Sequence, residues 1–306
     1  MKIAVSTSSF ATMDSTPLNM LLDHGYEVLD NPFHRKLTEK EIIIHLQGVD
    51  GLVAGLEPLT EKVFEDCPQL KAIARVGIGM DNVDSIAANS HGIKVSNTPE
   101  GPTNAVAEMT LAAALCLVRQ IIPANRAMHN NEWSKTIGKS LKNTPILIIG
   151  YGRIGRRVAE LFMAFGAEIF ITDPALKQED LISNEKWVEL SEGLRMAEII
   201  TIHAGGKDPI LNQKNISNIK HGAIIMNSAR GNLIEEVALL EGLNSGQISS
   251  AWLDVFHEEP YSGELSKHEN VLLTPHMSTY SIQCRKDMEI KAVQNLIADL
   301  ENGRTN

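Results

Sequence analysis

The 306-residue chain carries 28 Lys and Arg against 38 Asp and Glu, a formal net charge of −10, with 43% hydrophobic and 22% charged residues. This composition is that of an ordinary globular protein, and the length predicts two domains. The acidic balance argues against a nucleic-acid partner, which needs excess positive charge, but it allows a small anionic substrate held by a local cluster of arginines.

Cysteine usage and hydropathy predict the compartment. Cys67, Cys116 and Cys284 share no C-x-x-C spacing, which is typical of reduced thiols in the cytoplasm. No basic start followed by an apolar core marks a secretion signal, and the most apolar run, 109–118, is far shorter than the roughly 20 residues that span a bilayer. We therefore expect a cytoplasmic protein with no membrane partner.

The first hundred residues alternate between strand-like and helix-like segments. Short apolar runs predict strands at 2–7, 26–31, 51–55, 70–77 and 93–99. The segments between them predict helices at 17–25, 38–48, 59–68 and 82–92. This alternation predicts a parallel sheet covered by helices.

Residues 102–130 interrupt the alternation. The segment is predicted to be helical and is apolar around most of its circumference up to Pro123, which indicates a buried helix. After a turn, a second alternating block has strands predicted at 146–150, 167–173, 198–204, 222–227, 249–255 and 270–276, followed by an amphipathic helix at 281–301. The predicted fold class is therefore α/β, with two doubly wound parallel-sheet domains.

One loop of the second block carries the pattern G-x-G-x-x-G, at Gly150, Gly152 and Gly155, between a predicted strand and a predicted helix. In this context the glycines permit a tight turn, a close approach to a pyrophosphate, and close packing of the helix on the sheet, respectively. Asp173 ends the next strand, where an acidic side chain binds ribose hydroxyls and repels a 2′-phosphate. The pattern predicts a site for NAD in preference to NADP. The alternative is a structural glycine-rich turn followed by an ordinary strand-ending aspartate.

Three segments that follow later strands supply candidate catalytic side chains. Arg230 lies in "NSARG", Asp254 and the pair Glu258 and Glu259 lie in "LDVFHEEP", and His276 lies in "LTPH". Because ligands bind at the carboxyl ends of parallel strands, these side chains are placed where the site is expected. Taken singly, each has a plainer interpretation, as a salt-bridge arginine, a surface turn or a packing histidine.

Together, these residue types suit hydride transfer between a 2-hydroxy acid and NAD. An arginine grips the substrate carboxylate with two hydrogen bonds, and a histidine, with a reference pKa of about 6.5, takes the hydroxyl proton. A carboxylate behind the histidine would fix its tautomer. Glu259 precedes Pro260, which favours an extended backbone, and Glu258 has no such constraint, so the residues favour a pair without choosing its member firmly. No metal site is predicted, since the ten histidines are dispersed and no Cys cluster occurs.

The chain resembles the D-isomer-specific 2-hydroxyacid dehydrogenases over nearly its whole length. The matching segments are "ARVGIGMDNVD" (74–84), "NTPEGPTNAVAEMTLA" (97–112), "IGYGRIGRRVAELFMAFG" (149–166), "IKHGAIIMNSARGNLIEE" (219–236), "AWLDVFHEEP" (251–260) and "LLTPHMS" (272–278). The resemblance implies a flavodoxin-like substrate domain, 1–98 plus 282–306, with an inserted Rossmann NAD-binding domain, 99–281. It also implies a homodimer formed through the cofactor domain and the helix near 103–130.

The resemblance implies a role for each candidate catalytic residue. Arg230 is expected to bind the substrate carboxylate and carbonyl. Glu259 is expected to pair with the catalytic His276, which leaves Glu258 as a solvated neighbour. Asp254 is expected to contact the nicotinamide amide.

The resemblance also implies substrate-binding and cofactor-binding residues. The backbone amides of Val76 and Gly77 are expected to meet the substrate carboxylate, with Arg75 as a further substrate-binding candidate. The predicted cofactor site comprises Gly150, Gly152, Arg153, Ile154, Gly155, Asp173, His203, Ala229 and Asp254.

The substrate has several candidates. Similarity to short D-3-phosphoglycerate dehydrogenases makes D-3-phosphoglycerate the first, and because the chain ends 30 residues after His276 we expect no C-terminal regulatory domain. Against this candidate, Ala54 and Glu57 stand where phosphoglycerate-specific relatives often have Arg, and a carboxylate near a phosphate is unfavourable. Glyoxylate or hydroxypyruvate reduction is the alternative, and another anion such as phosphite is a further one. From another functional class, the alternative is an NAD(H)-binding regulatory protein on the same fold.

Three features depart from the family pattern. "AGGKDPIL" at 204–211 replaces a Pro-Leu-Thr-like stretch beside the nicotinamide. Asn232 stands where a second glycine is common, and Ser278 stands where Gly or Ala is usual. These departures concern the loop beside the nicotinamide and the width of the pocket, and they leave the expected chemistry unchanged.

Overall fold

The computed structural model describes residues 1–302, and the chain divides into two compact units. Unit 1 comprises Met1–Pro102 and Tyr280–Asn306, and unit 2 comprises Thr103–Thr279. The predicted domain boundaries were 98/99 and 281/282. The boundaries between the two units lie at 102/103 and 279/280, which are four and two residues away from the predicted ones.

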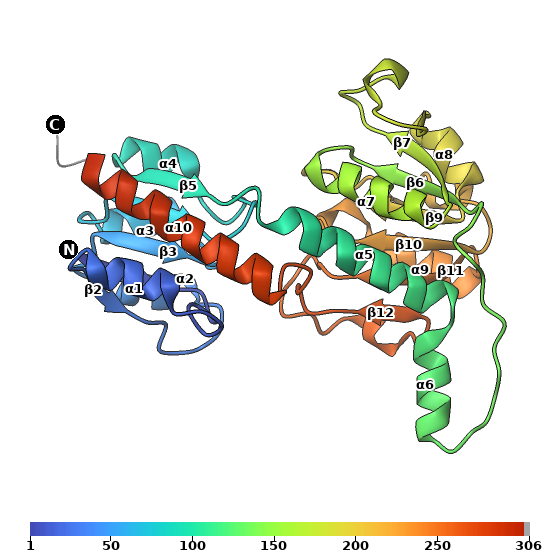
Figure 1. Ribbon diagram of the computed structural model, residues 1–306, viewed down its shortest axis with the longest axis horizontal. Helices are drawn as coiled ribbons and strands as arrows, with labels where there is room; N and C mark the ends of the chain where they lie inside the picture. Colours follow the sequence, from blue (N-terminus) through green and yellow to red (C-terminus); the bar gives the residue numbers. More distant parts are fainter. Residues whose placement is uncertain (303–306) are drawn as a thin grey trace. The chain divides into compact units, whose positions relative to one another are not determined.

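Unit 1 is built on a five-stranded parallel sheet, within the part of the chain that the structure describes (Figure 1). The strand order is β2-β1-β3-β4-β5. The strands are β1 (Lys2–Val5), β2 (Glu27–Leu29), β3 (Gly51–Ala54), β4 (Ala72–Arg75) and β5 (Lys94–Asn97). This is the flavodoxin-like order, and each strand coincides with a predicted one.

Helices cover both faces of the unit 1 sheet. One face carries α1 (Thr16–Asp23) and α10 (Ile282–Asn302), and the other carries α2 (Glu39–His45), α3 (Glu61–Asp66) and α4 (Ser85–Ser90). Local chemistry sets some helix starts: Thr38 and Glu41 form a capping box at α2, and Asp84 accepts a hydrogen bond from Ala87 N at α4. The last helix, α10, packs on β3, β4 and β5, which joins the end of the chain to its first block as expected.

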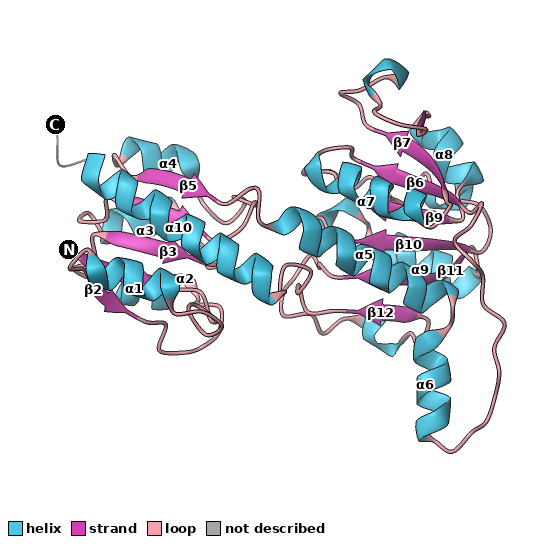
Figure 2. Cartoon of the chain, in the orientation of Figure 1, coloured by secondary structure: helices cyan, strands magenta, loops and turns pink. Residues whose placement is uncertain are grey.

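Unit 2 is built on a seven-stranded parallel sheet, counted over the described residues (Figure 2). The order is β12-β11-β10-β9-β6-β7-β8, which is the Rossmann order when counted from β6. The strands are β6 (Pro145–Ile149), β7 (Glu168–Thr172), β8 (Lys186–Trp187), β9 (Ile199–Ile202), β10 (Ala223–Asn227), β11 (Ile248–Leu253) and β12 (Val271–Leu273). No strand was predicted at β8, because two residues are too few for a periodic pattern.

Two helical layers enclose this sheet. The α5 (Pro102–Val118) and α7 (Arg153–Ala164) helices pack on one face, and α8 (Leu190–Met196) and α9 (Glu236–Ser245) on the other. The central strands are buried on both sides, which explains their continuous apolar sequences. The turns at their carboxyl ends are therefore the exposed edge at which side chains can meet a ligand.

The predicted helix at 102–130 is in fact two helices, α5 and α6 (Ile121–His129), bent by 63°. The break is at Gln120, whose φ of +55° is left-handed and cannot continue a helix. Pro123 lies in the first turn of α6, where its missing N–H group costs no hydrogen bond. Between residues 1 and 302 no single helix is long and apolar enough to cross a membrane; α5 and α6 reach that length only as this bent pair, and α5 belongs to a protein core.

Candidate active site

The glycine-rich loop joins β6 to α7, and each glycine meets a different local constraint. Gly150 has φ +92°, and a Cβ there would lie 2.7 Å from Ala204 N. A Cβ on Gly155 would overlap the carbonyl oxygen of Gly150. A Cβ on Gly152 would meet no atom within 4 Å. The first and third glycines are therefore needed by the fold, and the space at Gly152, at the N-terminus of α7, is open to a ligand.

Asp173 follows β7 and is held by the glycine-rich loop itself. Its two carboxylate oxygens accept hydrogen bonds from Tyr151 N (2.9 Å) and Ala175 N (2.9 Å). The Tyr151 hydroxyl donates to buried Glu185 (2.6 Å), and burial with this carboxylate neighbour raises the pKa of Tyr151. The open helix N-terminus and the fixed carboxylate are the two features that a dinucleotide requires, so the residues present fit NAD.

His203 lies at the end of β9, beside the glycine-rich loop. Its Nε2 shares a 2.9 Å hydrogen bond with Thr201 Oγ1. Burial lowers the pKa of the imidazole to about 3, so the ring is neutral at physiological pH. A neutral ring at this predicted cofactor position adds no positive charge beside the nucleotide.

The structure brings Glu259 and His276 together, although they follow different strands. His276 Nδ1 lies 2.9 Å from Glu259 Oε2, and the two side chains are 37% and 25% exposed. Glu259 Oε1 accepts a hydrogen bond from Phe256 N (3.1 Å), which fixes the carboxylate. Glu258 is exposed. Among the described residues, none forms a hydrogen bond with Nε2 of His276, so this nitrogen is available to a substrate proton.

Asp254 anchors the turn that carries His276. It is completely buried, and its carboxylate accepts hydrogen bonds from Thr274 Oγ1 (2.6 Å), Met277 N (2.9 Å) and Ser278 N (2.9 Å). His276 has φ +51°, a left-handed conformation that costs free energy for a residue with a Cβ. Asp254 therefore holds a strained turn in place, and its expected contact with the nicotinamide amide stays a prediction.

Arg230 lies in the loop after β10, which is held by hydrogen bonds to the side chain of Asn227. Asn227 Nδ2 donates to Arg230 O (2.8 Å), and Asn227 Oδ1 accepts from Ala229 N (3.0 Å). The Arg230 side chain is partly exposed, with Nη1 donating to Ala229 O (2.7 Å). A Cβ on Gly231 would overlap the backbone of Phe256, so this loop packs directly on the segment that carries Glu259.

Two of the family departures contact each other. The Asn232 side-chain amide donates to Gly206 O (3.1 Å) and Lys207 O (2.9 Å), both in the 204–211 loop. Asn232 thus holds the 204–211 loop in place through two hydrogen bonds to its backbone. Ser278, the third departure, is 5% exposed, and its Oγ has no hydrogen-bond partner among the described residues.

The backbone amides of two substrate-binding residues predicted in unit 1 make hydrogen bonds within that unit. Val76 N donates to Ala54 O (2.9 Å), and Gly77 N donates to Thr98 Oγ1 (2.7 Å). Both amides thus have acceptors inside unit 1, and their expected contact with a substrate carboxylate stays a prediction. The bond to Thr98 could not be read from the sequence, because Thr98 lies 21 residues from Gly77.

Two residues of the site were present in the quoted motifs but not singled out. Asn227 fixes the Arg230 loop, and Thr274 connects Asp254 with Trp252 Nε1 (3.0 Å). Asn227 is the last residue of β10, and Thr274 follows β12. A polar residue at the carboxyl end of a strand is the signal that could have identified both. Among residues 1–302, no group of His, Cys, Asp or Glu could hold a metal ion.

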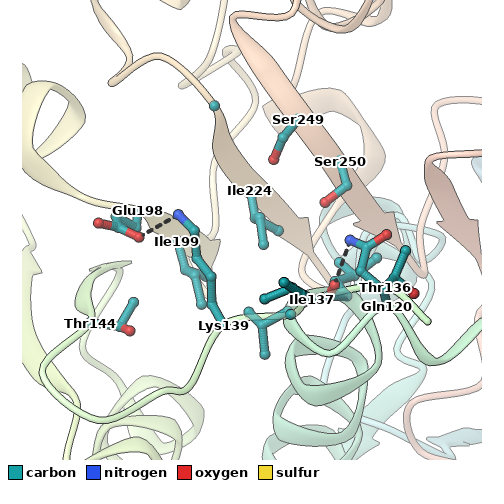
Figure 3. A pocket seen from close by; sticks show the side chains of 14 residues that line it. Gln120, Thr136, Ile137, Lys139, Thr144, Glu198, Ile199, Ile224, Ser249 and Ser250 are labelled. Carbon is teal, nitrogen blue, oxygen red and sulfur yellow. Dashed lines mark hydrogen bonds and ion pairs between the residues drawn. The ribbon is translucent and has the colours of Figure 1, made fainter.

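A cavity of about 330 Å³ lies at the opposite, amino-terminal end of β9, β10 and β11 (Figure 3). Its lining includes Glu198, Lys139 and Ile137, with Lys139 Nζ 2.8 Å from Glu198 Oε2. None of the predicted site residues lines it. Because all strands run parallel, this end of the sheet is far from the carboxyl edge that carries Arg230, Glu259 and His276.

Comparisons of the sequence and of the structure with known proteins point to the same family. A model of the D-isomer specific 2-hydroxyacid dehydrogenase NAD binding domain matches residues 111–278. The chain is 35% identical over 314 residues to D-3-phosphoglycerate dehydrogenase of Rattus norvegicus, covering 99% of this chain and 57% of that protein. It is 34% identical over 274 residues to hydroxypyruvate reductase of Thermotoga maritima, covering 86% of this chain and 89% of that protein. The apo structure of D-lactate dehydrogenase from Escherichia coli matches with a TM-score of 0.85 and 26% identity, covering 99% and 98% of the two chains.

Proposed function

Because the chain belongs to the D-isomer-specific 2-hydroxyacid dehydrogenase family, we propose that it catalyses NAD-dependent oxidation and reduction at C2 of a small 2-hydroxy or 2-keto acid. The observation that carries this proposal is the contact between His276 Nδ1 and Glu259 Oε2 at 2.9 Å, on the same edge as Arg230. A histidine oriented by a carboxylate beside an arginine is the arrangement that this redox chemistry needs.

Each residue performs one task. Arg230 binds the substrate carboxylate through two hydrogen bonds and orients C2. Nε2 of His276 takes the hydroxyl proton during oxidation and returns it during reduction. Glu259 is a positioning residue, because its hydrogen bond at Nδ1 keeps Nε2 as the reacting nitrogen. When NAD(H) is bound, it supplies or accepts the hydride.

The cofactor is NAD rather than NADP. Asp173, tied to Tyr151 and Ala175, places a negative charge where the ribose hydroxyls of NAD bind. This charge repels the 2′-phosphate of NADP. Gly150, Gly152 and Gly155 with the first residues of α7, Arg153 and Ile154, would hold the pyrophosphate, and His203, Ala229 and Asp254 would line the nicotinamide end.

Two classes of acid are candidates for the substrate. D-3-phosphoglycerate is supported by 35% identity to the rat enzyme, although the chain spans only 57% of that protein. Hydroxypyruvate or glyoxylate is supported by 34% identity to the Thermotoga maritima enzyme, which the chain covers to 89%, and by the buried carboxylate of Glu57 beside Arg75. We also propose a cytoplasmic homodimer as the working form of the enzyme.

The test is an initial-rate assay of NADH oxidation with phosphohydroxypyruvate, hydroxypyruvate, glyoxylate and pyruvate. We expect turnover with at least one of these acids, and loss of at least about 100-fold in kcat for His276→Asn. The matched control is NADH binding by His276→Asn, which should stay within about twofold of wild type because the imidazole acts on the substrate proton. Intact NADH binding with no turnover on any acid would instead support an NAD(H)-binding regulatory protein.

A further inference from the structure

The 204–211 loop, which follows β9, begins against the glycine-rich loop of unit 2. His203 N donates to Ile149 O (2.7 Å), and a Cβ on Gly150 would lie 2.7 Å from the backbone nitrogen of Ala204. The strands β6 and β9 are neighbours in the sheet, and the strand order reverses between them. Because a dinucleotide binds across such a point of reversal, the 204–211 loop borders the predicted cofactor site.

The position of Asp173 indicates which half of the cofactor lies beside this loop. Asp173 follows β7, so the adenosine half of NAD is expected on the β7 side of the reversal point. The nicotinamide half is then expected on the other side, over β9 and β10. These two strands lead into the 204–211 loop and the Arg230 loop. The 204–211 loop is thus expected beside the nicotinamide half and not beside the adenosine half.

The first part of the 204–211 loop contains two glycines and is held by one side chain. Gly206 has φ +145°, a conformation that residues with a Cβ rarely adopt, and a Cβ on Gly205 would meet no atom within 4 Å. Asn232 Nδ2 donates to Gly206 O (3.1 Å) and Lys207 O (2.9 Å). Among the residues that the structure describes, no other hydrogen bond reaches 205–208. Without Asn232 this stretch would therefore gain conformational freedom.

The end of the same loop is anchored independently of the Asn232 side chain. Ile210 N and Leu211 N both donate to Leu233 O (2.8 and 3.1 Å), and Asn215 Nδ2 donates to Ile210 O (2.7 Å). Asn232 itself is partly exposed, so its replacement leaves no deeply buried group without a partner. A substitution there should therefore loosen residues 205–208 and leave the rest of the segment in place.

We propose that Asn232 is a positioning residue that fixes residues 205–208 before the cofactor binds, and thereby preforms the nicotinamide half of the cofactor site. This inference rests on the proposed function, since it takes NAD(H) to be the cofactor. A loop that is already ordered in the free enzyme loses little conformational entropy when the cofactor binds, so the cofactor is bound more tightly. The adenosine half, beside Asp173 and the glycine-rich loop, does not depend on Asn232.

The test compares two ligands that share adenosine and pyrophosphate: NADH, which carries the nicotinamide, and ADP-ribose, which lacks it. For Asn232→Ala we expect the Kd of NADH to rise at least about fivefold, the effect of about one net hydrogen bond, while the Kd of ADP-ribose stays within about twofold. Asn232→Gln keeps the amide on a longer side chain and should recover part of the loss. The matched control, Asn244→Ala, removes an exposed amide from α9 and should change neither Kd. Isothermal titration calorimetry measures all four.

A second measurement reports on the loop in the cofactor-free enzyme. Trypsin cleaves after Lys207 only when this stretch can leave its folded conformation, so cleavage at Lys207, followed by mass spectrometry, should be at least about fivefold faster in Asn232→Ala than in wild type. Equal rates in the two proteins, including no cleavage of either, would show that Asn232 does not fix the loop.

The binding outcomes separate this inference from the proposed function. An equal loss for NADH and ADP-ribose in Asn232→Ala, or no loss for NADH, would assign Asn232 a purely structural role and overturn the inference. A loss confined to NADH, in a protein with no turnover on any keto acid, would refute the proposed activity and leave the inference standing. Failure of the wild type to bind either ligand would refute both.

Discussion

The loop that carries Arg230 is held by the side chain of Asn227, whose Nδ2 donates a hydrogen bond to Arg230 O. We expect Arg230→Ala to raise the substrate KM and lower kcat together, reducing kcat/KM at least about 100-fold, because a charged bidentate contact is lost in both the ground and transition states. Arg230→Lys, which keeps the charge but not the planar fork, should recover part of the loss. Steady-state kinetics with NADH decides this, and an unchanged kcat/KM would refute the carboxylate-binding role.

The lowered pKa of the partly buried imidazole of His203 leads to a prediction about how stability depends on pH. Its pKa in the folded protein is about 3, below the unfolded value of about 6.5. Below pH 6.5 the unfolded chain therefore binds a proton that the folded chain does not, so stability is lost as the pH falls from about 6.5 toward 3. His203→Gln lacks this proton and should gain about 1 kcal/mol in free energy of unfolding relative to wild type between pH 7.5 and 5.5. Urea unfolding at the two pH values measures the difference, and a difference that does not change with pH would show that the ring is accessible to protons.

At the scale of elements, different glycines of the glycine-rich loop are needed for cofactor binding and for stability. Gly152→Ala adds a methyl group to open space, so the melting temperature should stay within about 2 °C of wild type while the Kd for NADH rises at least about tenfold, because the pyrophosphate needs that space. Gly155→Ala drives its Cβ into Gly150 O and should lower the melting temperature by several degrees. Equal effects of the two substitutions on NADH binding and on stability would contradict this division of roles.

Hydrophobic patterns in the sequence predicted the buried strands correctly but did not predict where the helix after residue 102 breaks. Strands such as β6 and β10 are buried on both faces, so their apolar runs are unambiguous even without their neighbours. The break between α5 and α6 was not predicted: 102–130 was expected to be one helix, and Pro123, in the first turn of α6, does not mark the break. The left-handed Gln120 carries no sequence signal of its own.

At the scale of the whole molecule, α6 and the segment after it expose large apolar side chains. Trp133 is 81% exposed and Ile137 is 100% exposed, and the cavity shown in Figure 3 lies beneath Ile137 and its neighbours. Exposed apolar groups on one projecting segment are typical of an interface between proteins, which supports the proposed homodimer.

This proposal predicts a change in molecular mass. Wild type should elute in light-scattering chromatography with twice the chain mass of 33.6 kDa, and the double variant Trp133→Ser, Ile137→Ser should shift toward 33.6 kDa. The control is Ile86→Ser, which removes an 86% exposed apolar side chain from α4 in unit 1 and should leave the mass unchanged. A wild-type protein that elutes as a monomer at all concentrations would contradict the dimer.

The amino-acid sequence by itself determined the α/β alternation, the two sheets, the glycine-rich loop with Asp173, and the set of polar residues after the strands of unit 2. These features are local, because a strand, a turn and a helix start depend on residues that are close in the chain. The residue pattern alone left Glu258 and Glu259 open, and only the family resemblance favoured Glu259, which the structure places beside His276. Only the tertiary structure showed that Asp254 holds the His276 turn and that the amides of Val76 and Gly77 donate to Ala54 and Thr98. Those outcomes depend on contacts between residues that are distant in sequence, whose geometry is set by the packing of whole loops and not by any pattern within one of them.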